Sequence, residues 1–252
     1  MSGWLAIAGL GPGDAALVTP EVGAALAEAT DVVGYVPYVA RVAPRAGLTL
    51  HASDNRVELD RAALALRMAA EGRRVVVVSS GDPGVFAMAS AVFEALEAGP
   101  SPWRALDIRV LPGITAMLAA SARAGAPLGH DFCAINLSDN LKPWTLIEKR
   151  VRLAVEADFA MAFYNPRSRA RPEGFARILA LLLECCGPAR PILFARAVST
   201  PEEALCSMPL GEARAEMADM RTMVILGSST TRTIARAGQP ILYTPRFVAA
   251  GA

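Results

Sequence analysis

The residues best suited to chemistry form a glycine-rich turn, Ser80–Phe86, which follows four consecutive valines, Val75–Val78. Apolar residues at helical spacing come next, so the pattern predicts a buried strand, a tight turn and a helix. In open parallel sheets small ligands bind at such places, because strand ends, backbone amides and helix starts converge there. The turn carries one carboxylate, Asp82, and no lysine. A cationic or neutral ligand with hydroxyl groups therefore suits it better than a polyphosphate.

A second glycine-rich loop, Gly9–Asp14, follows the first predicted strand and invites comparison with the dinucleotide fingerprint GxGxxG. Asp14 stands where the third glycine belongs, and Pro12 interrupts the loop. The acid at a suitable distance, Asp31, precedes the second predicted strand, whereas a ribose-binding acid belongs at the far end of that strand. The fingerprint therefore fails, although a dinucleotide-dependent oxidoreductase stays open as an alternative of a different class.

Strands and helices alternate around these two loops. The predicted strands span residues 5–9, 31–34, 75–79 and 108–111, and the predicted helices span 59–71 and 86–98. A further helix is expected to begin at Pro20, with Thr19 as its cap. This alternation predicts a parallel sheet with helices on its faces.

A second series begins near the middle of the chain, after the interruption at Gly125–Gly129. Its predicted strands span residues 132–137, 159–163, 192–196 and 223–226, and its predicted helices span 144–157 and 172–184. We therefore expect an α/β fold of two α/β domains with largely parallel sheets, at residues 1–125 and 126–252. Two such domains leave a cleft in which a ligand can bind.

Composition narrows the classes of function. The chain has 252 residues, 53% of them hydrophobic, and a net charge of +1, which gives no case for a nucleic-acid partner. No apolar stretch approaches the roughly 18 residues that cross a bilayer, and the first residues lack the features of a secretory signal, so a cytoplasmic protein without membrane contact is expected. Two histidines and four cysteines without CxxC spacing argue for reduced thiols and no metal site.

Three blocks of sequence, taken together and in order, are more specific than any one of them: residues 9–14 with 17–20, residues 80–86, and residues 112–116. In this combination the chain resembles the tetrapyrrole methylase family over nearly its whole length. Further residues resemble the branch that methylates C(17) of precorrin-3B: Gly34, Tyr35, Tyr38, Asn55, Arg56, Glu58, Arg61, 125–133, 137–139, Pro143, Trp144, Ile147, Glu148, Arg150, 164–166, Ser168, Arg171 and 244–246. The chain departs from the family pattern at Asn140, Lys142 and Phe247, which concerns contacts with the substrate rather than the reaction.

The resemblance implies the two-domain architecture of a class III methyltransferase, with S-adenosyl-L-methionine as methyl donor in the cleft between the domains and S-adenosyl-L-homocysteine as product. A tetrapyrrole would bind in a trough beside it, and a homodimer is usual in the family. Carried over position by position, the donor-binding residues are Pro12, Gly81, Asp82, Val85, Phe86, Thr115, Ala116, Tyr164, Asn165 and Ala197. Asp82 would accept a hydrogen bond from the methionine amino group or a ribose hydroxyl.

The implied reaction is methylation of precorrin-3B at C(17) with ring contraction to precorrin-4, in cobalamin (vitamin B12) biosynthesis. Methyl transfer needs alignment more than acid catalysis, whereas ring contraction needs proton management. The candidates for the latter are Tyr35, Glu58, His130 and Asp139, although Glu58 also suits a helix cap and His130 a backbone contact.

The carboxylates of the implied precorrin substrate need positively charged side chains to bind them. The matching motifs favour Asn55, Arg56 and Arg171 as substrate-binding residues, and the wider set of candidates is Arg41, Arg45, Lys142, Arg150, Arg167, Arg169 and Arg246. Two alternatives within the fold stay open, namely methylation at another ring carbon and a cobalt-containing substrate. A non-catalytic corrinoid carrier is a further alternative from a different class.

Overall fold

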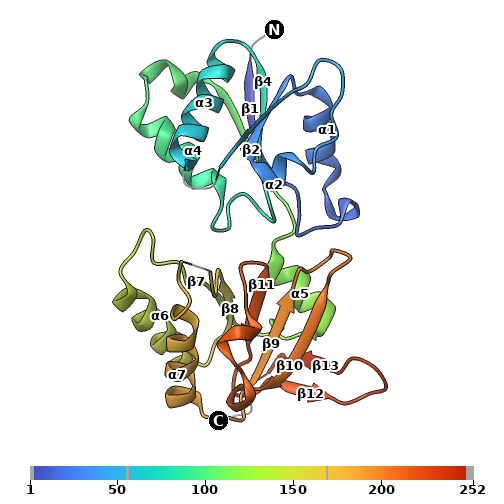
Figure 1. Cartoon of the computed structure of the whole chain (residues 1–252), viewed down its shortest axis with the longest axis vertical. Coiled ribbons are helices and arrows are strands. Elements are labelled where there is room, and N and C mark those ends of the chain that lie inside the picture. The colour runs from blue at the N-terminus through green and yellow to red at the C-terminus, as the bar shows by residue number, and fades with distance from the viewer. Residues whose placement is uncertain (1–2, 55–56, 169, 248–252) are drawn as a thin grey trace. The chain divides into compact units, whose positions relative to one another are not determined.

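A computed structural model of the chain describes residues 3–54, 57–168 and 170–247. It divides into two compact units, Met1–Thr115 and Ala116–Ala252 (Figure 1). The first unit contains β1 (Trp4–Gly9), α1 (Pro20–Glu28), β2 (Asp31–Tyr35), α2 (Val36–Val39), β3 (Thr49–Ser53), α3 (Glu58–Ala70), β4 (Arg74–Ser79), α4 (Met88–Ala98) and β5 (Asp107–Leu111). Every element expected here from the sequence is present within two residues of its expected bounds.

The sheet of the first unit has the order β3-β2-β4-β1-β5, and all its neighbouring strands are parallel. Helices α3 and α4 cover one face (Figure 1), where they pack on Leu5, Ile7 and Val77, while α1 packs on the opposite face. Both faces of β4 are thus buried, which explains its unbroken valines. The expected parallel sheet is confirmed for this unit.

Strand order explains where a ligand site belongs in this sheet. The chain leaves β1 toward β2 on one side and leaves β4 toward β5 on the other, although β1 and β4 are neighbours. Connections that run in opposite directions from adjacent strands open a crevice at the carboxyl ends of those strands. The two glycine-rich segments begin at these ends.

The second unit contains α5 (Ala116–Ala124), β6 (Gly125–Ala126), β7 (Phe132–Asn136), α6 (Trp144–Glu156), β8 (Ala160–Tyr164), α7 (Gly174–Cys186), β9 (Pro191–Arg196), β10 (Ala204–Pro209), β11 (Thr222–Leu226), β12 (Arg232–Ile234) and β13 (Ile241–Tyr243). Its larger sheet has the order β10-β9-β11-β8-β7, and a small sheet joins β12, β13 and β6. Helices α6 and α7 pack side by side on the larger sheet (Figure 1).

The larger second sheet differs from the expected parallel arrangement. Only β7 and β8 pair in parallel, because β11 runs in the opposite direction between β8 and β9 and because β10 folds back on β9. Strand patterns report burial but carry no information on direction, so the sequence did not distinguish these pairings.

The position of α5 sets the division between the units. The sequence placed the boundary after residue 125, whereas α5 packs against β11, β6 and β13 and so belongs to the second unit. Gly125 continues directly from α5 into β6 with a φ of 132°, a conformation that side chains disfavour.

Two absences concern the described residues. No helix in the described ranges combines the length and apolar character needed to cross a bilayer. Within the same ranges, no three His, Cys, Asp or Glu side chains gather as a metal site.

Candidate active site

The carboxyl edge of the first sheet gathers predicted site residues from all five strands. In sheet order, Glu58 follows β3, Tyr35 ends β2, Gly81 follows β4, Pro12 follows β1 and Thr115 follows β5. Because the strands are parallel, their carboxyl ends meet at one edge. Residues up to about 100 positions apart in the sequence are thereby brought to one rim of the first unit.

Four glycines bring backbone atoms together at this rim, and we call them the glycine floor: Gly9, Gly11, Gly81 and Gly113. A methyl group on Gly9 would lie 2.5 Å from the Gly81 carbonyl oxygen, and one on Gly113 would lie 2.2 Å from the same oxygen. The Gly11 and Gly81 amides each donate to the other residue's carbonyl, at 3.2 and 2.9 Å. Gly11 and Gly81 also have positive φ angles, 67° and 63°, which favour glycine. The turns after β1, β4 and β5 therefore contact one another through their main-chain atoms.

Asp82 joins two of these turns. Its Oδ1 accepts the Gly84 amide at 2.8 Å, and its Oδ2 accepts the Gly113 amide at 3.0 Å. The expected donor-binding carboxylate is thus engaged with the backbone, although each oxygen keeps a further lone pair for a ligand. Phe86, at the end of the same turn, has a φ of 53° and a half-exposed side chain.

The side chain of Arg41 binds the backbone of the loop that follows β1. Its guanidinium donates to the carbonyl oxygens of Gly11 and Gly13, at 3.0 and 3.2 Å, and to that of Leu10. Burial lowers the pKa of Arg41, and the nearby Tyr38 opposes that effect. A sequence candidate for substrate carboxylates is therefore committed to the loop itself.

Aromatic and basic groups surround Tyr35 and Glu58. The Tyr35 and Tyr38 rings meet edge to face with centroids 5.3 Å apart, and burial, followed by the proximity of Tyr35, raises the pKa of Tyr38. Arg61 is 4% exposed and donates to Ser53 Oγ at 2.9 Å and to the Asp54 carbonyl at 2.6 Å. Glu58 is the first residue of α3, whose cap position is Val57. Asn55 and Arg56 lie outside the described residues.

One edge of the larger second sheet gathers the remaining predicted residues. Asp139 follows β7, Tyr164 ends β8 with Asn165 next to it, and Ala197 follows β9. The Tyr164 hydroxyl accepts the Met117 amide at 3.4 Å, so it lies at the start of α5 beside Ala116.

Asn165 is held in a left-handed conformation, with a φ of 51°. Its Nδ2 donates to Asn136 Oδ1 at 3.1 Å, and the same oxygen accepts the Ser138 amide at 2.9 Å. Asn136 thus fixes both strand ends, a role that the sequence analysis missed. The only sequence signal was an amide residue at the end of a predicted strand.

His130 lies away from these residues within the second unit. It precedes β7, whereas Asp139 follows it, so the two proton-transfer candidates flank opposite ends of one strand. The His130 ring lies 3.7 Å from the adjacent Asp131 carboxylate.

Several basic side chains predicted to bind substrate carboxylates donate hydrogen bonds to backbone carbonyl oxygens instead. Arg45 donates to those of Leu26, Ala27 and Ala29 at the end of α1, and Lys142 donates to that of Ser138 at 2.8 Å. Arg171 donates to Leu137 O at 3.2 Å and lies 3.7 Å from the Asp139 carboxylate. Arg169 lies outside the described residues.

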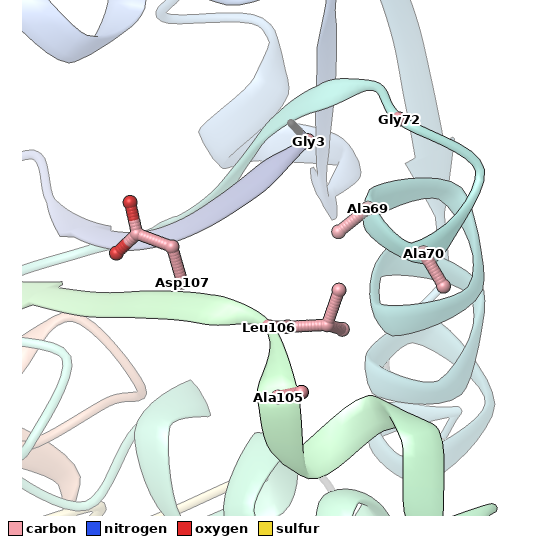
Figure 2. A pocket seen from close by; sticks show the side chains of 7 residues that line it. All are labelled: Gly3, Ala69, Ala70, Gly72, Ala105, Leu106 and Asp107. Atoms are coloured by element: carbon pink, nitrogen blue, oxygen red, sulfur yellow. The ribbon is translucent and has the colours of Figure 1, made fainter. Parts of the chain in front are cut away.

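Two hollows flank the described units. One, of about 380 Å³, is lined by Gly3, Ala69, Ala70, Gly72, Ala105, Leu106 and Asp107, and Figure 2 shows Ala69 and Leu106 facing one another across it. It lies at the amino ends of β1, β4 and β5, opposite the glycine turns, and its single carboxylate pairs with Arg109. It therefore offers no chemistry to a ligand of the turns.

The second hollow, of about 570 Å³, lies beside the carboxyl end of β8 and the start of β11. Its lining is Arg167, Ser168, Pro172, Asp219, Met220 and Arg221. Asp219 is paired with Arg196 at 2.8 Å. The hollow thus contains two further arginines at the edge that carries Asn165, and one of them, Arg221, pairs with Glu202.

Comparisons with known proteins agree with this architecture. Residues 5–214 match the model of the Tetrapyrrole (Corrin/Porphyrin) Methylases. The chain is 53% identical, over 99% of its length and 98% of the other, to a Precorrin-3B C(17)-methyltransferase of Sinorhizobium sp. It is 38% identical, over 90% of its length and 93% of the other, to a probable cobalt-factor III C(17)-methyltransferase of Salmonella typhimurium.

Among solved structures, the crystal structure of the methyltransferase CobJ superposes with a TM-score of 0.93 at 69% identity. The match covers 97% of this chain and 100% of that one. On the family model and on these full-length matches, the chain is a member of the tetrapyrrole (corrin/porphyrin) methylases.

Proposed function

We propose that the chain transfers a methyl group from S-adenosyl-L-methionine to C(17) of precorrin-3B, with ring contraction, in cobalamin biosynthesis. The observation that carries this is the 53% identity, over 99% of the chain, to a Precorrin-3B C(17)-methyltransferase. The chain is a methyltransferase by family, and the glycine turns supply a site suited to such a donor.

The residues of the first unit fit a folded, cationic nucleoside. Gly81, Asp82 and Val85 would hold the donor from the turn after β4, with Pro12 and Thr115 on either side. The turn has no lysine, and its carboxylate favours an amino or hydroxyl donor over a phosphate. Bound there, S-adenosyl-L-methionine supplies a methyl group on a positively charged sulfur.

The second unit supplies the other part of the donor site in this proposal. Tyr164, Asn165, Ala197 and Ala116 all belong to one sheet edge or to the helix start beside it. Asn165 and Ala197 adopt left-handed conformations without the ligand, which lowers the entropy lost on alignment. In this proposal, residues of both units contact the donor.

Proton management in ring contraction falls to Tyr35, Glu58 and Asp139 in this proposal. All three lie at or after the carboxyl end of a strand, whereas His130 precedes one. For the substrate carboxylates we retain Arg171 with Asn55 and Arg56, and the arginines of the larger hollow, Arg167 and Arg221, extend that basic edge.

Mass spectrometry of the product tests the methyl transfer, and the NMR spectrum of the product identifies the ring carbon. Incubation with precorrin-3B and the methyl donor should add one methyl mass and yield the ring-contracted product. The cobalt-containing counterpart is a second candidate because of the relative from Salmonella typhimurium, so the same assay is run with cobalt-factor III. Faster turnover of the cobalt compound would favour that candidate, and methylation at another carbon would reject both.

Calorimetry separates the classes of function. S-adenosyl-L-homocysteine should bind and NADH should not. Binding of NADH alone would indicate an oxidoreductase, and binding of the tetrapyrrole with neither nucleotide would indicate a carrier.

The proposal includes a homodimer in the cytoplasm, as is usual for this family. Sedimentation equilibrium should return twice the chain mass of 26.5 kDa. A single-chain mass would remove the dimer from the proposal.

A further inference from the structure

The turn after β9 adopts a costly conformation. Ala197 and Ser199 both have left-handed φ angles, 50° and 61°, although neither is a glycine. Ser199 is 7% exposed, and its Oγ is buried without a hydrogen-bond partner among the described residues. Both features oppose this conformation, so other contacts must hold it.

Glu203 supplies those contacts. Its Oε2 accepts the Ser199 amide at 2.6 Å and lies 3.4 Å from Nε of Arg123. The turn is closed further by the Ala197 carbonyl, which accepts the Thr200 amide at 3.1 Å. One carboxylate oxygen therefore serves both the strained turn and a cation on another element.

Arg123 connects this turn to α5, the helix that begins at the proposed donor contact Ala116. It lies in the last turn of α5, whose first turn receives the Tyr164 hydroxyl through the Met117 amide. Glu203 thus links the end of β9 to the carboxyl end of α5, while Tyr164 links the end of β8 to its start.

We propose that Glu203 is a positioning residue for the methyl donor: it holds Ala197 and Ser199 in the left-handed conformation that the donor requires and fixes that turn against α5. The inference rests on the proposed function, because Ala197 and Ala116 are taken as donor contacts. Glu203 itself does not touch the reacting atoms.

The primary test is the affinity for S-adenosyl-L-homocysteine, measured by calorimetry. E203A should raise the dissociation constant about tenfold, because the charge-assisted bond to the Ser199 amide is lost. The donor KM should rise equally while kcat at saturating donor stays near the wild-type value. A purely structural role would lower the unfolding temperature without changing the dissociation constant.

Glycine at position 199 provides a rescue. It adopts a φ of 61° without a side-chain penalty and removes the buried hydroxyl, so E203A/S199G should regain most of the lost affinity. The matched control is E202A, since Glu202 is the adjacent acid but pairs with Arg221. Its donor affinity should equal that of the wild type.

A second set of variants keeps the Ser199 bond and removes only the ion pair. E203Q and R123M should each raise the dissociation constant about two- to threefold, and the double variant should add nothing further, because both changes break one contact. This set decides the matter if E203A does not fold.

Three results overturn the inference: E203A that binds like wild type, a double variant E203A/S199G as weak as E203A, or additive effects of E203Q and R123M. Wild-type protein that does not bind S-adenosyl-L-homocysteine overturns the proposed function instead.

Discussion

The carboxylate of Asp82 accepts the backbone amide of Gly113 at 3.0 Å and so joins the turn after β4 to the turn after β5. These turns are 31 residues apart in the sequence. One side chain therefore fixes the backbone of two turns of the first unit relative to each other.

Removal of that carboxylate should weaken donor binding. In D82A two backbone amides lose their acceptor, and we expect a loss of ~1 to 3 kcal/mol in binding of S-adenosyl-L-homocysteine, measured by calorimetry. D82N keeps one acceptor oxygen and should lose about half as much. Unchanged affinity in D82A would remove Asp82 from the donor site.

The glycine floor should not tolerate a methyl group. In G113A the new carbon would lie 2.2 Å from the Gly81 carbonyl oxygen, so we expect the free energy of unfolding to fall by ~2 to 4 kcal/mol in urea titrations. The control is G23A, where open space surrounds a glycine inside α1. That variant should gain about 0.5 to 1 kcal/mol, and equal effects at both positions would contradict the packing argument.

Two arginines test whether loop support and donor binding are linked. R41M removes three hydrogen bonds to the loop Leu10–Gly13 and should weaken S-adenosyl-L-homocysteine binding about tenfold. R45M removes similar bonds from the end of α1 and should lower only the free energy of unfolding, by about 1 kcal/mol. Equal losses of affinity would show that the loop has no special role.

Asp31 should make stability depend on acid pH. It is 3% exposed at the start of β2 and lies 2.8 Å from His51 Nε2 and 3.2 Å from a nitrogen of Arg73. Burial raises its pKa, but the hydrogen bonds from His51, Thr30 and Arg73 outweigh burial, so the pKa lies below its ordinary value.

A lowered pKa in the folded state means that stabilisation is complete above the unfolded value of about 3.9 and is lost as the pH falls through the folded value. The advantage of wild type over D31N in free energy of unfolding should therefore be full at pH 7 and shrink below about pH 4. Urea titrations across this range measure it. A constant difference would exclude the carboxylate charge as its source.

Local signals predicted much of the fold correctly. Thr19 caps α1 through a 3.3 Å bond from the Val22 amide, as its position before Pro20 indicated. Strand β4 and the turn after it could be predicted because burial selects valines and the conformation of the turn selects glycines. The α/β class followed from these signals, and the family was identified from the resemblance of the combined motifs.

The remaining features depend on contacts that sequence spacing does not encode. β10 carries a mixed pattern, Ala-Leu-Cys-Ser-Met-Pro, and was not predicted, because a half-exposed edge strand needs few apolar residues. Arg41 donates hydrogen bonds to backbone oxygens 28 to 31 residues away, and no sequence pattern predicts these bonds. Nor does any pattern predict the left-handed conformation at Ser199, which tertiary contacts impose.

In the first sheet, the ion pairs and the glycine turns lie at opposite ends of the strands. The ion pairs around Asp31 lie at the amino end of β2, whereas the glycine turns lie at the carboxyl ends of β1 and β4. Substitutions around Arg73 and Thr30 can therefore change the thermal stability of the first unit at the amino ends of its strands, without altering the glycine turns at the carboxyl ends.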